Sequence, residues 1–399
     1  MAVVYRIIIG VSYLLRTLLE AAVVVLTLLL VFCTHCYSLV YLLTDSHLAA
    51  IAHFQRIAAP RFERLKFRTV TSMNHSSICK GAETLSNYPI LQVVMAVKIV
   101  FCLLGIVATA VHFKQLGIAW LVHPNAKVLY MFHIFWSIYV PLTYSIAFST
   151  DFIRFLLPHD DPCDYTISTL WGIILRALPV LGLVAQSFTM LSFAIERIIA
   201  TLSPVTYENV KSRALGVVLG LLSILGSSSI VYYILSPVTH WSAPLPMTAV
   251  RVWENGDHYQ LFLSTYIYLE ISTITIFAVT LVINYCTAAR PSSQIISLSN
   301  KYQVNENKHL IITLLPCFMV HCLLNLVPIL GLKLYNLIMI YDQAGYAAWV
   351  ECWAQAQTYS LLMPLIIYFR LRLRKRKVTD VHNTDAHFVQ LNTIFNKRP

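Results

Sequence analysis

Seven long apolar stretches recur along the chain, with short polar segments between them. They lie at residues 90–113, 128–149, 169–200, 215–235, 261–286, 310–334 and 347–369. Each has the roughly 20 residues that a helix needs to cross a hydrocarbon core about 30 Å thick. Prolines fall inside several stretches, and packed transmembrane helices tolerate the kinks that they cause. The sequence therefore predicts an all-α, polytopic membrane protein whose seven-transmembrane helix bundle occupies residues 73–369.

Composition favours the bilayer over water as the solvent of this chain. Of its 399 residues, 58% are hydrophobic and only 12% are charged, whereas soluble domains have about 25% charged residues. The formal net charge of +11 could indicate a nucleic-acid partner. However, the basic residues lie in short loops and in one tail, where they act as topology signals. We therefore expect the lipid bilayer as a partner and no nucleic acid.

The loop charges predict the orientation in the membrane. The connections 114–127, 201–214 and 287–309 together with the tail 370–399 hold 15 Lys and Arg residues, and the opposite connections hold 2. Positively charged loops stay in the cytoplasm. We therefore predict a plasma-membrane protein with a cytoplasmic C-terminus and with the segment before Pro89 outside. The tail opens with a basic run that acts as a membrane anchor or as an amphipathic eighth helix.

The first 72 residues fit this scheme less well and are treated as a separate extension. An apolar stretch at 7–43 is followed by a basic segment at 44–72. Three interpretations stay open: an eighth span, a signal sequence, or material upstream of the true start at Met73. Asn74 begins the chain's one N-x-S/T sequon, on the predicted outer side, so we predict N-glycosylation there.

An acid–arginine pair, Glu196-Arg197, ends the third predicted span at its cytoplasmic side. It resembles the Asp/Glu-Arg-Tyr motif of rhodopsin-type receptors, although Ile198 replaces the tyrosine. Such an arginine can pair with its acidic neighbour in a resting bundle and be freed on opening. The simpler interpretation is an arginine that marks a helix end and reaches the headgroups.

The residues around this pair resemble a known family. The order Glu196-Arg197, Ala200-Thr201 and Tyr207-Glu208 is similar to the ER-x-x-AT…YE pattern of nematode serpentine chemoreceptors of the Sra superfamily, most of all the alpha-beta class (Srab). His123-Pro124-Asn125 and Asp161-Pro162-Cys163 agree in order and placement. The resemblance implies a chemosensory G-protein-coupled receptor in a sensory-neuron membrane. It also implies a small environmental ligand, a heterotrimeric G protein as partner, and a switch role for Glu196 and Arg197.

Two cysteines fall on the predicted outer side. Rhodopsin-type receptors tie the top of the third span to the second outer loop, but residues 236–260 contain no cysteine. Cys163 stands at the corresponding place, and Cys79 is its outer partner by position. In an oxidising compartment a Cys79–Cys163 disulfide would hold the N-terminal segment over the bundle mouth. Two free thiols are the alternative.

Three ionisable residues inside predicted spans stand out: Lys98, Arg176 and Glu270. Because such residues are costly in a membrane, each is a candidate for function. We predict that they line a ligand pocket in the outer half of the bundle, where Arg176 and Glu270 could pair. A purely structural interhelical ion pair is the competing interpretation.

Other functions lack sequence support. The chain shows no catalytic motif, metal-ligand pattern or cofactor fingerprint, so we expect no enzyme, metal or cofactor. The alternative function is an eight-span small-molecule transporter or ion channel that uses Lys98, Arg176 and Glu270, but no internal repeat supports it. The step Gly216-x-x-x-Gly220 could support close helix packing within the bundle or in a homo- or hetero-oligomer.

Overall fold

The fold comes from a computed structural model, which describes residues 75–116, 121, 123–203, 207, 212–288, 298–338, 347–348, 350–352 and 355–372. The elements are α3 (His75–Ser86), α4 (Pro89–Leu116), α5 (Pro124–Leu156), η1 (Pro162–Tyr165), β1 (Ile167–Ser168), α6 (Thr169–Leu202), α8 (Ala214–Leu235), β2 (Pro244–Leu245), α9 (Gly256–Ala288), α10 (Leu298–Ile338) and η3 (Ala356–Thr358). The predicted extension at 1–72, the sequon at Asn74 and most of the tail lie outside the described residues.

Six helices in the described part of the chain, α4, α5, α6, α8, α9 and α10, are long and apolar enough to cross a membrane. Each contains one of the first six predicted spans and extends beyond it. The excess is largest in α10, whose 41 residues make a helix about 60 Å long. The prolines at 141, 179, 316 and 328 lie inside these helices, as expected for packed transmembrane segments.

The seventh predicted span, 347–369, is not one continuous helix. Residue 355 is non-helical, η3 follows it, and helical backbone resumes at 359–372. Local polar side chains explain the break. The Gln355 side-chain amide donates to the Cys352 carbonyl (2.6 Å), and the Thr358 hydroxyl lies 3.2 Å from Gln355 Oε1. Side chains that bond nearby backbone in this way compete with regular helix formation.

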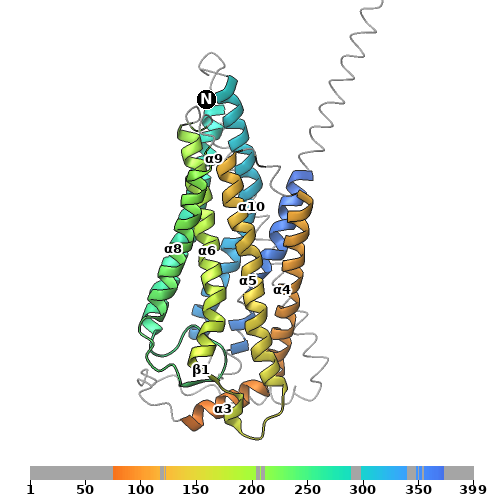
Figure 1. The fold of residues 1–399 in the computed structure, drawn as a ribbon, viewed down its shortest axis with the longest axis vertical. Coiled ribbons are helices and arrows are strands. Elements are labelled where there is room, and N and C mark those ends of the chain that lie inside the picture. Colours follow the sequence, from red (N-terminus) through yellow and green to blue (C-terminus); the bar gives the residue numbers. More distant parts are fainter. Residues whose placement is uncertain are drawn as a thin grey trace, which may run out of the picture.

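The helices form an elongated bundle in which α6 packs against α5, α8, α9 and α10 (Figure 1). Its outer surface carries large exposed apolar side chains, for example Leu103 and Val107 on α4 and Leu222 and Leu225 on α8. An apolar exterior of this extent suits a protein that faces lipid. Polar and charged side chains are instead buried between the helices, and they build the sites described below.

Gly216 and Gly220 are used for packing within the bundle. A Cβ at Gly216 would lie 2.7 Å from the Asn125 carbonyl oxygen on α5, and one at Gly220 would overlap the Phe132 ring. The Gly216 amide also donates to Asn125 Oδ1 (3.1 Å). The small-residue step therefore lets α8 approach α5 closely.

One end of the bundle is covered by α3, η1 and a two-strand ribbon (Figure 1). Strands β1 and β2 pair antiparallel, with Ile167 opposite Leu245 and Ser168 opposite Pro244. The ribbon joins the connection before α6, which contains β1, to the connection after α8, which contains β2. We call this the α3 end and call the opposite end, where α6 finishes, the Arg197 end.

Candidate functional site

At the Arg197 end, the predicted acid–arginine pair is fully enclosed. Glu196 and Arg197 lie in the last turns of α6 and are 0% and 3% exposed. The Arg197 guanidinium bonds to the Glu196 carboxylate. It also donates to Asn307 Oδ1 of α10 (2.8 Å) and to the Tyr207 hydroxyl (3.1 Å). The guanidinium charge of Arg197 is therefore paired with groups inside the bundle.

Tyr207 and His123 close the same site from the two adjoining loops. The Tyr207 hydroxyl donates to Glu196, and its ring stacks on His123 with centroids 3.9 Å apart. His123 is the N-cap of α5 and accepts from the Asn125 amide (3.3 Å). Burial, and then the charge of Arg197, lower the pKa of His123 to about 4. The imidazole is therefore neutral at physiological pH and does not compete with Arg197 for Glu196.

Amide and hydroxyl groups extend this network to α9. Asn307 Nδ2 donates to Thr201 Oγ1 (2.6 Å), and Asn284 Nδ2 of α9 donates to the same oxygen (2.8 Å). The ends of α6, α9 and α10 are thus joined by polar side chains. We call Glu196, Arg197, Tyr207 and Asn307 the Arg197 cluster. The Arg197 end of the bundle is closed in this structure, because Arg197 cannot bind another protein without losing these partners.

Near the α3 end, Glu351 of the seventh segment lies between two cations. Its Oε2 is 2.5 Å from Lys98 Nζ of α4, and its Oε1 is 2.8 Å from Arg176 Nη2 of α6. The Phe148 ring lies under both cations, 4.6 Å from Lys98 Nζ and 4.7 Å from the Arg176 guanidinium carbon. Both cations are at least nine-tenths buried. Glu351 is their main neutralising partner, because it contacts both of them.

A second carboxylate continues the network toward the ribbon. Asp151 of α5 lies 3.9 Å from Arg176 and 2.6 Å from Arg154 Nη2. It accepts bonds from the amide and the hydroxyl of Thr248. The Thr248 hydroxyl also accepts from Arg176 Nε (2.9 Å). We call Lys98, Asp151, Arg154, Arg176 and Glu351 the five-charge cluster.

The predicted pairing of Arg176 with Glu270 is wrong. Glu270 lies 3.1 Å from His321 Nδ1 of α10 and 2.6 Å from Ser187 Oγ. The cause is depth: α9 begins at Gly256, so Glu270 is about 21 Å along its helix, whereas Arg176 is about 10 Å along α6. Lys98 joins Arg176, and Glu270 belongs to a separate polar group.

Sequence reasoning missed Glu351 and the buried role of Asp151. Glu351 was detectable, because it is an acid inside the apolar stretch 347–369 and ionisable residues in spans need partners. Asp151 lies two residues beyond the predicted span 128–149. Helix α5 continues to Leu156, which places Asp151 inside the helix and among the cations.

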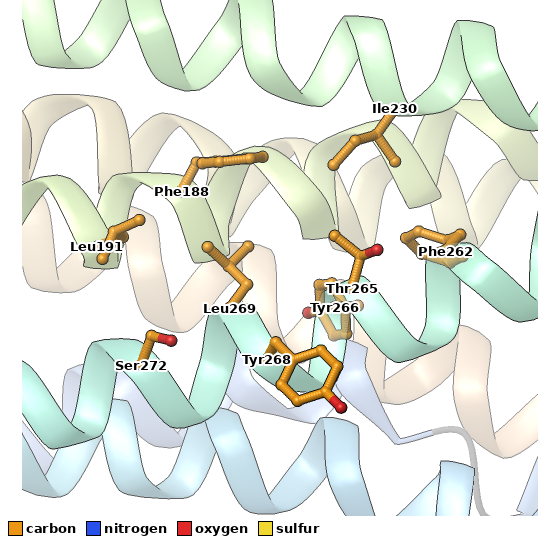
Figure 2. A pocket seen from close by; sticks show the side chains of 9 residues that line it. All are labelled: Phe188, Leu191, Ile230, Phe262, Thr265, Tyr266, Tyr268, Leu269 and Ser272. Atoms are coloured by element: carbon orange, nitrogen blue, oxygen red, sulfur yellow. The ribbon is translucent and has the colours of Figure 1, made fainter.

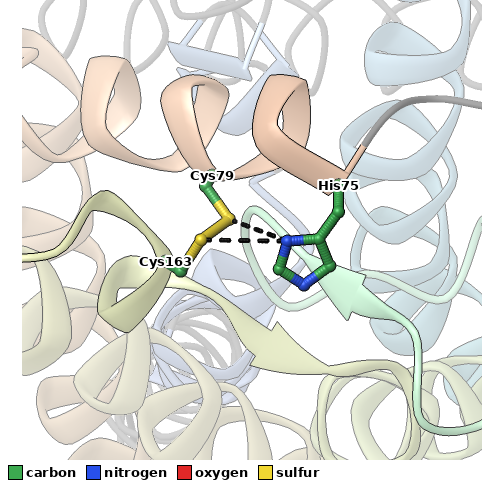
Figure 3. A group of neighbouring side chains, drawn as sticks. All are labelled: His75, Cys79 and Cys163. Carbon is green, nitrogen blue, oxygen red and sulfur yellow. Dashed lines mark hydrogen bonds between the residues drawn. A yellow bond between two sulfur atoms is a disulfide. The ribbon is translucent and has the colours of Figure 1, made fainter.

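The structure joins Cys79 of α3 and Cys163 of η1 by a disulfide (Figure 3). His75 Nδ1 lies 3.6 Å from Cys79 Sγ and 3.9 Å from Cys163 Sγ. These three residues offer metal-ligand atoms within 4.8 Å of one another. Metal binding requires free thiolates, however, and both sulfurs are in the disulfide. The bridge fastens α3 to the connection before α6.

Two hollows open near these sites. A groove of about 290 Å³ between α6, α8 and α9 is mostly apolar and includes Phe188, Tyr266 and Tyr268 (Figure 2). Tyr268 is 70% exposed, so the groove faces the bilayer side. A second hollow of about 330 Å³ lies at the α3 end, between the α3–α4 junction and the end of α5. Its wall is more polar and includes Ser86, Gln92 and Tyr165.

Comparison with known proteins covers most of the chain. The family described as serpentine type 7TM GPCR receptor class ab chemoreceptor matches residues 76–394. A curated relative, serpentine receptor class alpha/beta-14 of Caenorhabditis elegans, is 26% identical over 335 residues, covering 75% of this chain and 79% of the relative. The matched region contains both the Arg197 cluster and the five-charge cluster.

Proposed function

The chain belongs to the serpentine class ab family of seven-transmembrane chemoreceptors, and from this premise we propose that it binds a small environmental molecule and activates a heterotrimeric G protein. Family membership confirms the predicted seven-span bundle and the resemblance to the alpha-beta class. The chain is accordingly a GPCR-like sensory receptor and a multi-pass membrane protein. The ligand, the G-protein contact and the sensory-neuron plasma membrane are the parts that we propose.

The enclosed state of Arg197 is the observation that carries the coupling proposal. A permanent cation is costly to bury unless it is paired. Arg197 is held by groups from its own helix, from α10 and from the Tyr207 loop. A cation held by contacts between separate elements is released when those elements part. We therefore assign the described geometry to the resting receptor.

Activation then follows as a shift between two populations. A ligand that binds the open bundle better than the closed one raises the open fraction. Opening separates α6 from α10 and breaks the bond between Arg197 and Asn307. The guanidinium then faces the cytoplasm, where it can bond to carbonyl or carboxylate groups of a Gα subunit.

The decisive experiment is nucleotide exchange on a Gα subunit by purified receptor. We expect Arg197→Ala to abolish the exchange that wild-type receptor stimulates. Arg213→Ala is the matched control, since Arg213 is exposed at the same end and lies outside the Arg197 cluster. Ligand-driven ion current or uptake without any G protein would instead support a transporter or channel.

The ligand side of the proposal rests on the buried charges near the α3 end. Lys98 and Arg176 stay candidate ligand contacts, because they lie within the five-charge cluster beneath the ribbon. Glu270 is a candidate at a deeper level, where Tyr266 contacts Ser187 (2.9 Å) and lines the apolar groove. To decide whether the ligand binds at the five-charge cluster or at the depth of Glu270, each residue is substituted. The ligand concentration for half-maximal nucleotide exchange is then measured.

We also propose that the α3 end is extracellular and that the Arg197 end is cytoplasmic. The loop charges support this orientation. Glycosidase sensitivity at Asn74, with Asn74→Gln as control and protease access to a C-terminal tag, tests it. Residue 74 and the tag on the same side of the membrane would contradict the proposed topology.

A further inference from the structure

The Cys79–Cys163 disulfide has an imidazole beside it (Figure 3). His75 is the first residue of α3, and its Nδ1 lies 3.6 Å from Cys79 Sγ and 3.9 Å from Cys163 Sγ. A spacing of four residues places His75 and Cys79 on the same face of the helix. Because bridged sulfurs carry no hydrogen, an imidazole N–H is the donor in these contacts. A hydrogen-bond donor is therefore in place beside both sulfurs before the bridge opens.

The two bridged cysteines differ in their access to solvent. Cys79 is only 2% exposed, and its contact with His75 is partly buried. Cys163 is half-buried, and its contact with His75 is exposed. Thiol–disulfide exchange starts when a thiolate attacks one of the two sulfurs, and access helps to decide which one. A dissolved thiolate therefore reaches Cys163 Sγ, and Cys79 Sγ is the sulfur that leaves.

We propose that this bridge is an exchange site for small dissolved thiols, an activity beyond the proposed receptor function. The thiolate attacks Cys163 Sγ and forms a new S–S bond with it, while the Cys79–Cys163 bond breaks. The electron pair of the broken bond goes to Cys79 Sγ, so Cys79 is reduced to a thiolate and the incoming thiol is oxidised to a disulfide. The His75 N–H donates to the new thiolate, and a leaving thiolate stabilised in this way departs faster. Attack of Cys79 on the mixed disulfide reverses the step.

Acidic side chains around the attacked sulfur select among thiols. Three exposed acids lie within three residues of Cys163: Asp160, Asp161 and Asp164. Asp161 Oδ1 accepts a bond from the Cys163 amide (2.8 Å), which holds one carboxylate beside the attacked residue. On α3, the charges of Lys80 and Glu83 offset each other. A local excess of negative charge attracts cations and repels anions, so the site favours thiols that carry a positive charge.

The test uses full-length receptor in lipid nanodiscs, treated with cysteamine, mercaptoethanol or mercaptopropionate. These thiols carry a positive, no and a negative charge. Samples are quenched with iodoacetamide and mapped by mass spectrometry without reduction. We expect the thiol adduct on Cys163 and the alkyl group on Cys79. Each rate is divided by that of the same thiol with hydroxyethyl disulfide, and this ratio should be about tenfold higher for cysteamine than for mercaptopropionate. A bridge that stays closed, or an adduct on Cys79 instead, would overturn the inference.

Variants test the two local effects. His75→Ala should slow opening of the bridge about fivefold, the value of one hydrogen bond, without changing the thermal unfolding midpoint. His75→Gln, whose amide can still donate, should keep part of the rate. His258→Ala is the control, since His258 lies at the same end in α9 and bonds to the Tyr233 carbonyl. Asp164→Asn should lower the preference for cysteamine about twofold. A wild-type rate in His75→Ala would contradict the role of the imidazole.

Thiol exchange and G-protein activation are separable. A receptor that activates Gα, but whose bridge resists all three thiols, contradicts only the exchange site. A receptor whose bridge opens as described, but that never stimulates nucleotide exchange, contradicts only the G-protein proposal.

Discussion

Lys98 and Glu351 form a buried ion pair across 253 residues of sequence, with 2.5 Å between Nζ and Oε2. The lysine side chain is 0% exposed and the glutamate side chain is 8% exposed. The pair connects the first span to the seventh segment just before its break at residue 355. Because Glu351 also contacts Arg176, one carboxylate fastens three elements at the α3 end.

Glu351→Ala should therefore destabilise the receptor strongly. The change leaves Lys98 and Arg176 buried without their shared carboxylate, and breaking a buried pair from one side costs about 3–5 kcal/mol. Equilibrium unfolding in mixed micelles measures the loss. Asp257→Asn is the control, because Asp257 is exposed at the start of α9 and should change stability by less than about 0.5 kcal/mol. Equal effects of the two substitutions would refute the stabilising role of Glu351.

Tyr207→Phe should raise basal activity. The variant keeps the aromatic ring on His123 but removes the hydroxyl that contacts Arg197 and Glu196. Losing these two hydrogen bonds to charged groups favours the open state by about tenfold or more. Ligand-free nucleotide exchange on Gα provides the measurement. Tyr232→Phe is the control, since Tyr232 is 76% exposed on α8. Basal exchange that stays at the wild-type level would argue against Tyr207 as part of the resting restraint.

The disulfide prediction concerns additivity. Cys79→Ser and Cys163→Ser should each destabilise the receptor by about 2–5 kcal/mol, because either change frees an 84-residue loop. The double variant should be no worse than one single variant, since both remove the same bond. Peptide mapping without reduction detects the bridge, and Cys286→Ser on α9 serves as control. Additive losses would indicate that the two thiols act separately.

The loop residue Glu254 gives a pH prediction. Burial alone would raise its pKa, but hydrogen bonds from Thr239 and His240 outweigh burial and lower the pKa to about 2. A carboxyl whose pKa is depressed on folding stabilises the fold above its unfolded value, near 4.5, and this contribution is lost as the pH falls toward 2.

Thermal unfolding of wild type and of Glu254→Gln tests this prediction across pH. The difference in midpoint should be constant above about pH 5 and should shrink steadily in more acidic buffer. Asp257→Asn should show no comparable pH-dependent difference. A difference between wild type and Glu254→Gln that grows on acidification would have the wrong sign for a depressed pKa.

Much of the fold was predictable, because span length and hydropathy depend on local composition. The first six predicted spans correspond to α4, α5, α6, α8, α9 and α10, and the prolines stayed inside them. The predicted spans are shorter than the helices, because polar residues such as Asp151 continue a helix when tertiary partners bury them. The break at Gln355 was missed, since side-chain bonds to nearby backbone leave no mark on hydropathy.

The sequence by itself determined the solvent, the bundle and the family, and it singled out Glu196, Arg197, Lys98 and Arg176. Hydropathy and short motifs are properties of neighbouring residues, so no fold is needed to read them. Only the tertiary structure decided which charges meet. Glu351 rather than Glu270 neutralises Arg176, because pairing depends on depth and facing across helices that are far apart in the chain.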